Sequence, residues 1–234
     1  MNKLRVIIRG PILTRSGYGE QARFAYRALL TRPDLFEVYV LPTNWGRCGW
    51  TVDDDEERKK LDEVIQTTPL YIQQCQQRQQ NPFDVSIQVT IPNEWEMLAP
   101  VNIGYTAGTE TDKVSVKWLE SANAVNKIIA VSEHTKAGFV TTEYYGTDEN
   151  GQEATLSCQT PIDVVNFPAR TLTPEPVEIE TSTSFNFLTV AQWGPRKNLT
   201  NLIYGFAKEF HDNPDVGLIV KGNIAKNCHI DKLS

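Results

Sequence analysis

The sequence predicts an α/β fold in which a mostly parallel sheet is covered by helices. Short apolar runs of strand length alternate with amphipathic, helix-like stretches along almost the whole chain. Strands that alternate with helices in this way are joined by right-handed crossovers and lie parallel in one sheet. With 234 residues, the chain suits one large domain or two modest ones.

The first half of the chain predicts four strands and three helices. Its strands are apolar or alternating runs that end at glycine, proline or polar residues, and its helices have separate apolar and charged faces. Acids open the second helix, and Thr68-Pro69 is a typical start for a third. In chain order we expect strand 4–10, helix 20–30, strand 36–41, helix 53–66, helix 68–80, strand 83–89 and strand 101–105.

The second half continues the same alternation. Ser132 is a favourable N-cap for the helix that follows the apolar run "KIIAV". Asn150-Gly151 is a strong hairpin-turn signal within residues 146–161. The remaining expected elements are helix 113–125, strand 127–131, helix 133–145, strand 162–167, strand 185–190, helix 199–210 and strand 216–222.

A stretch rich in Pro, Thr and Glu separates two parts of the chain. It predicts a linker over residues 169–184, after a complete domain over 1–168. Residues 185–234 hold only a βαβ beginning, short for a domain, so we expect the incomplete start of a second one. We therefore expect the first domain to fold and the chain alone to catalyse little or nothing.

Composition narrows the classes of function. A net charge of −6 argues against a sequence-independent hold on nucleic acid. No apolar run is long enough for a transmembrane segment or is placed as in a signal peptide. The four cysteines are scattered without a C-x-x-C, which is typical of reduced thiols and predicts a cytoplasmic protein.

The stretch "TRSGYGEQA" carries Gly17, Gly19 and Ala22 in the spacing G-x-G-x-x-A. A dinucleotide-binding site is disfavoured, because six residues separate Gly10 from Gly17 and no acid ends the second strand. Two alternatives stay open. The glycines permit a bend before a helix, or they form a loop whose backbone N–H groups face a phosphate or sugar.

Two longer stretches, "GPILTRSGYGEQARFAYRALL" and "FNFLTVAQWGPRKNLTNLIYGFAKEF", resemble the retaining, family 4 group of GT-B glycosyltransferases. "KIIAVSEHTKAGF" is similar to the strand, serine and helix late in the family's first domain. The resemblance implies two facing Rossmann-like domains, acceptor side first, and transfer of a hexose from a nucleotide-diphosphate sugar with retention and without a required metal. The resemblance further implies that the nucleotide-sugar donor binds residues that match the family's motifs: Ser16, Gly17, Tyr18, Gly19, Arg196, Lys197, Asn198 and Gly222.

The charges agree with that implication. A departing diphosphate gains negative charge, which lysine and a forked arginine stabilise. A cation at a helix start opposes the helix dipole, so Arg196 and Lys197 are not explained by helix stability. Two features depart from the family: Gln192 stands where members often carry an arginine, and the later motif of two glutamates is missing.

The remaining candidates lie in loops after expected strands. By the resemblance, Glu110 and then His134 are the first candidates for acceptor-side catalysis. Trp45 and Trp95 either offer flat faces to an acceptor sugar or pack their loops against the core. Scattered histidines give no metal site, and the D-x-D of residues 53–55 is better explained as helix-start acids.

The sequence thus predicts a hexosyltransferase whose partners are a nucleotide-sugar donor and a sugar, lipid or protein acceptor. Two rivals remain: an inactive module that binds nucleotide sugars, and a carbohydrate-binding or scaffold protein that keeps only an acceptor cleft. Binding of a nucleotide sugar would distinguish the enzyme and the inactive module from the carbohydrate-binding or scaffold protein. Catalytic turnover would then distinguish the enzyme from the inactive module.

Overall fold

The structure is a computed structural model that describes residues 2–46, 48–51, 54–147, 151–169, 171 and 173–224. The chain divides into two compact units, with the boundary after Ala169. Each unit is described by itself below. Among the described residues, no helix has both the length and the hydropathy needed to cross a membrane.

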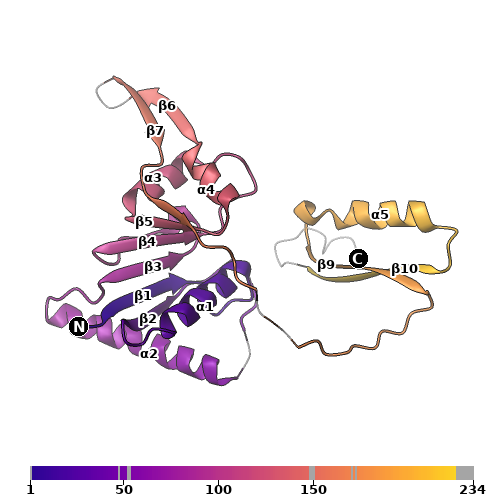
Figure 1. The fold of residues 1–234 in the computed structure, drawn as a ribbon, viewed down its shortest axis with the longest axis horizontal. Coiled ribbons are helices and arrows are strands. Elements are labelled where there is room, and N and C mark those ends of the chain that lie inside the picture. Colours follow the sequence, from indigo (N-terminus) through magenta and orange to yellow (C-terminus); the bar gives the residue numbers. More distant parts are fainter. Residues whose placement is uncertain are drawn as a thin grey trace. The chain divides into compact units, whose positions relative to one another are not determined.

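The first unit is a Rossmann-like α/β fold built on a six-stranded sheet in the order β2-β1-β3-β4-β5-β8 (Figure 1). All neighbouring strands in this sheet are parallel, as the alternating pattern predicts. The elements of the sheet layer and its helices are β1 Leu4–Gly10, α1 Gly17–Leu30, β2 Phe36–Pro42, α2 Glu56–Gln77, β3 Val85–Val89, η1 Pro92–Glu94, β4 Val101–Thr106, α3 Val116–Ala124, β5 Lys127–Ala130, α4 Glu133–Val140 and β8 Ile162–Val164.

The core lies on both faces of this sheet. One cluster, with Ile8, Val40 and Val89 from the strands, packs under Ala22 and Tyr26 of α1. A second cluster joins β5 and β8 to α3 and α4, and a third joins β1 and β2 to the C-terminal half of α2. The helical face predicted for residues 20–30 is thus confirmed as a core face.

The two helices expected over 53–66 and 68–80 are one helix, α2, so that prediction is wrong. Pro69 lies inside it. Both halves of α2 pack against the core, which outweighs the stop signal of the proline. The buried Thr68 hydroxyl donates to Val64 O (2.7 Å) and accepts the Val40 N–H of edge strand β2 (3.2 Å). The helix therefore also covers part of the sheet edge formed by β2, which would otherwise leave backbone groups unpaired.

The helix expected over 133–145 is also too long. It ends at Val140, and residues from Glu143 enter an antiparallel hairpin of β6 Glu143–Thr147 and β7 Glu153–Ser157 (Figure 1). Tyr144 explains the change, because its ring packs beside Leu156 on the core and its hydroxyl donates to Val114 O. The expected turn residue Asn150 lies outside the described residues.

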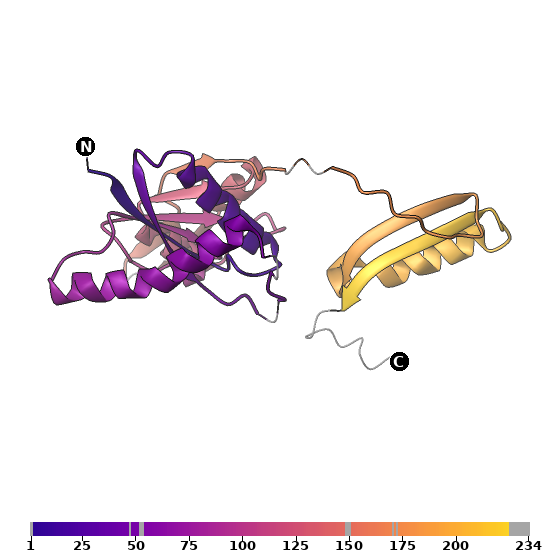
Figure 2. The same cartoon turned by 90° about the horizontal axis from the view of Figure 1, so that it is seen from below.

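The second unit holds β9 Phe185–Trp193, η2 Pro195–Lys197, α5 Leu199–Phe210 and β10 Val216–Ile224. The two strands are parallel, and α5 lies along one face of the pair (Figure 2). Phe187 contacts Phe206 and Phe210 of that helix. Leu188 and Val190 lie on the face of β9 opposite to that of Phe187, and each is 64% exposed. This face of the strand pair is therefore apolar and exposed in the structure.

Candidate functional site

The candidate residues of the first unit all follow the carboxyl ends of strands. β1 lies between β2 and β3, so the chain leaves β1 in one direction along the sheet and returns to its other side for β3. Ligands of open α/β sheets bind outside the carboxyl ends of strands at such a switch point. The loop from β1 to α1, residues 11–16, begins at this point.

Ser16 starts the helix that follows this loop. It is the N-cap of α1, and its Oγ accepts the N–H of Gly19 at 2.9 Å. The helix therefore begins at Gly17, three residues before the start expected from the apolar pattern. The first N–H groups of a helix have no intrahelical acceptor; Ser16 accepts that of Gly19, and the helix dipole makes this end favourable for an anion.

The two glycines of the turn have different environments. A Cβ on the buried Gly19 would overlap the Thr14 carbonyl oxygen and lie 2.9 Å from Pro11 O, so only glycine fits there. Gly17 is exposed, its φ is not left-handed, and a Cβ there would meet nothing within 4 Å. Packing thus explains Gly19 and leaves Gly17 without a structural reason.

Tyr18 links this turn to the end of β4. Its hydroxyl shares a hydrogen bond with Thr106 Oγ1 (2.9 Å) and accepts the Ala107 N–H (3.1 Å). Thr135 of α4 donates to Ala107 O, and Gly108 takes a left-handed φ of +73° against Thr135. Burial raises the pKa of Tyr18, so the hydroxyl stays protonated at neutral pH. Three strand ends are thereby tied together.

The two tryptophans proposed for the acceptor side have opposite environments. Trp45, in the loop after β2, is half-buried and its ring centroid lies 4.6 Å from that of Tyr18. Trp95 is only 8% exposed and packs on Gly104 in the second core cluster. The core-packing alternative therefore describes Trp95, and its ring offers no face to a sugar.

Buried polar side chains hold the segment that carries Trp95. Gln88 accepts the Glu96 N–H, and Asn102 accepts the Leu98 and Ala99 N–H groups. These amides replace the helix that a parallel β3–β4 crossover ordinarily carries. Alternating polar residues in a strand ordinarily indicate a solvent-facing side, so the sequence pattern alone does not indicate this role.

Glu110 and His134 are both exposed. Glu110 lies in the loop after β4, and His134 is the second residue of α4, after β5. These strands are neighbours, so both residues belong to the same edge of the sheet as Ser16 and Trp45. Ser132 caps α4 by accepting the Thr135 N–H, as expected.

The acids of the D-x-D motif lie at a helix start. Asp55 is the N-cap of α2 and accepts the Arg58 N–H at 2.8 Å, whereas Asp53 lies outside the described residues. Within the described ranges, no group of three or more His, Cys, Asp or Glu side chains is arranged to hold a metal ion.

The candidates of the second unit also gather at one edge. Arg196, Lys197 and Asn198 are exposed and lie in the turn after the end of β9 at Trp193, and Gly222 lies near the carboxyl end of the adjacent β10. Asn198 is the N-cap of α5 with a left-handed φ of +53°, but its side chain makes no capping bond. Asparagine is a preferred cap, so the start of this helix is left more open than its sequence predicts.

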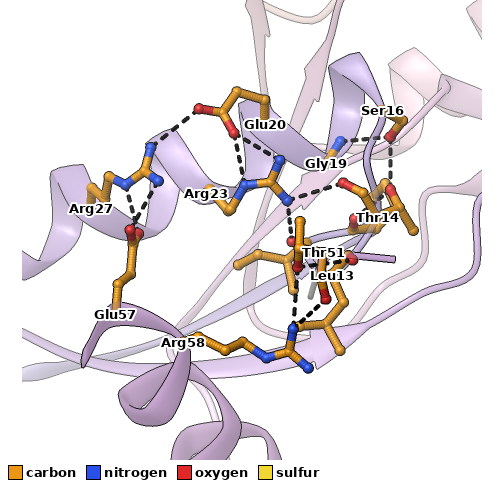
Figure 3. Close-up of polar contacts among 12 residues, drawn as sticks. Leu13, Thr14, Ser16, Gly19, Glu20, Arg23, Arg27, Thr51, Glu57 and Arg58 are labelled. Atoms are coloured by element: carbon orange, nitrogen blue, oxygen red, sulfur yellow. Dashed lines mark hydrogen bonds and ion pairs between the residues drawn. The ribbon is translucent and has the colours of Figure 1, made fainter. Parts of the chain in front are cut away.

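Sequence reasoning missed the part played by Arg23 and Arg58. By its position Arg23 belongs to the charged face of α1, yet its side chain is only 14% exposed and donates to two loop carbonyls (Figure 3). A charged residue three positions from a glutamate signals only a helix-surface pair. The contact with the loop depends on the tertiary fold.

The chain matches no model of a known protein family and no curated protein. The fold itself defines the class of protein: a Rossmann-like α/β protein with candidate ligand-binding loops at the carboxyl edge of each of the two parallel sheets.

Proposed function

We propose that this chain belongs to a GT-B-type, family 4-like glycosyltransferase, with the first unit on the acceptor side and the second unit on the donor side. The reaction breaks the bond between the anomeric carbon of a hexose and the diphosphate of a nucleotide. It forms a glycosidic bond to an acceptor oxygen, with retention, and the acceptor gives up its proton.

The observation that carries the proposal is Gly17. Gly17 is an exposed glycine at the first position of a helix, where alanine would be compatible and more stable, and no neighbour among the described residues requires it. It lies where a ligand of this fold class approaches the backbone, at the carboxyl end of β1. A ligand that closely approaches the backbone explains the absence of a side chain.

The second unit supports the same proposal independently. Lys197 and Arg196 place two positive charges next to the start of a 12-residue helix in an acidic chain. Such charges stabilise the negative charge that a nucleotide diphosphate gains as it leaves. The proposal assigns this role to these side chains and requires no metal.

Lys197→Ala should weaken the binding of a nucleotide diphosphate by about 1.5–3 kcal/mol, because a charge-assisted contact is lost. Titration calorimetry with UDP, GDP and ADP measures the change. Lys208→Ala, on the last turn of the same helix, is the matched control and should bind like the wild type. Equal affinities for the wild type and Lys197→Ala, with both folded, would remove Lys197 from the site.

A further inference from the structure

Two loops at the carboxyl edge of the first unit are joined backbone to backbone. The Arg15 N–H donates to Gly49 O (2.7 Å), and the Thr51 N–H donates to Leu13 O (2.8 Å). Thr14 and Trp50 form an antiparallel bridge between these bonds. The loop before α1 and the segment before α2 are therefore bonded to each other and are called here the paired loops (residues 11–16 and 49–51).

Arg23 holds the first of the paired loops from α1. Its Nη1 donates to Ile12 O (2.6 Å) and to Thr14 O (3.0 Å), and its Nε donates to Glu20 at 2.8 Å (Figure 3). Glu20 also pairs with Arg27, so the carboxylate is fixed from two sides. Glu20 therefore orients the Arg23 guanidinium toward the loop carbonyls.

Arg58 holds the second of the paired loops from α2. Its Nη1 donates to Thr51 O at 2.7 Å, while its Nε donates to both carboxylate oxygens of Asp62. The arrangement repeats that of Arg23, because a carboxylate on the same helix, that of Asp62, orients the arginine. The arginine in turn binds the loop carbonyl of Thr51 (Figure 3).

The held carbonyl is next to the glycine turn. Thr14 O, which accepts from Arg23, is the atom that a side chain at position 19 would overlap. The same threonine bonds Ser16 Oγ, the cap of α1 (2.8 Å). Any shift of Thr14 therefore reaches both Ser16 and Gly19.

We propose that Arg23 and Arg58 are positioning residues that fix the Ser16–Gly19 turn for its ligand by clamping the paired loops. The link to a nucleotide-sugar ligand rests on the proposed function; the clamping itself does not. Because the bonds of both arginines end on carbonyls of the paired loops, we expect their effect to be local rather than global.

Arg27 provides a matched control on the same helix. It bonds both carboxylate oxygens of Glu57 in α2 (2.6 and 3.0 Å) and contacts Glu20, but it donates to no loop carbonyl among the described residues. Replacing it removes none of the bonds that the arginines donate to the paired loops. It acts on Arg23 only indirectly, through the longer contact with Glu20 (3.4 Å), so its effect on the paired loops should be smaller than that of Arg23→Gln.

The test is amide hydrogen exchange on the 234-residue chain, comparing wild type, Arg23→Gln, Arg23→Lys, Arg58→Gln and Arg27→Gln. Arg23→Gln and Arg58→Gln should speed exchange at the Arg15 and Thr51 amides by about tenfold, the effect of losing a charge-assisted bond. Strand amides such as Ile8 should keep their protection. Arg23→Lys should be intermediate, since lysine keeps the charge but lacks the fork.

Three outcomes decide the inference. Faster exchange confined to the paired loops supports it. Unchanged exchange there, or an equal effect of Arg27→Gln, overturns it. An increase spread over the whole unit also overturns it, because the arginines would then be general stabilisers.

A second arm separates this inference from the proposed function. UDP, GDP and ADP are titrated into the same proteins. Weaker binding in Arg23→Gln at an unchanged melting temperature supports the positioning role for the ligand. Failure of the wild type to bind any of them counts against the proposed function, while the exchange data still decide the clamp.

Discussion

Gly19→Ala lowers the free energy of unfolding of the first unit by about 3 kcal/mol, the upper range for overpacking a closed site. The new Cβ overlaps a backbone oxygen, Thr14 O, and lies 2.8 Å from Thr14 Oγ1. The loop cannot simply retreat, because Thr14 is bonded to Arg23 and bridged to Trp50. Urea unfolding of the variant and the wild type measures the difference.

Gly17→Ala is the matched control and should act in the opposite direction. Its backbone is compatible with alanine and its surroundings are open, so stability rises by about 0.4–1 kcal/mol. The same variant should bind nucleotide diphosphates more weakly. If Gly19→Ala is as stable as Gly17→Ala, the close contact between the Thr14 carbonyl and Gly19 is contradicted.

Trp95→Ala should cost about 3–5 kcal/mol of stability, the range for truncating a large buried aromatic residue. The indole packs on Gly104 in the core, and its surroundings are held by Gln88 and Asn102. Chemical denaturation with tryptophan-independent detection, such as far-ultraviolet circular dichroism, gives the value.

Trp45→Ala is the comparison. It loses mainly an aromatic contact with Tyr18, worth about 0.5–1.5 kcal/mol. Of the two tryptophans, only Trp45 should alter sugar binding while the protein remains folded. A similar stability loss for both would contradict the division between a core residue and a surface residue.

The fold was largely predictable because strand and helix periodicity reports burial directly. The parallel sheet, α1 and the cap at Ser132 all follow from local patterns. The errors at α2 and α4 have one cause: tertiary contacts of Thr68 and Tyr144 outweighed local signals for a helix stop and a helix continuation.

The candidate site was predictable in part. Strand-end position alone places Ser16, Trp45, Glu110 and His134 at one edge. Gly19 is structurally required because the carbonyl of Thr14, five residues earlier, lies close to it, and the sequence does not indicate this contact. Likewise, the sequence pattern indicates a surface position for Arg23, and only the tertiary structure shows that it binds the loop before α1.

The most direct measurement of the central claim is hydrogen exchange of the chain with and without saturating nucleotide diphosphate. The account predicts slower exchange at Gly17 and Tyr18, at the start of α1, and at residues 197–199, at the start of α5. Both sites lie at carboxyl edges of parallel strands. Protection confined to other segments, or no protection at saturating UDP, GDP or ADP, would contradict the assignment of these loops to a nucleotide-sugar site.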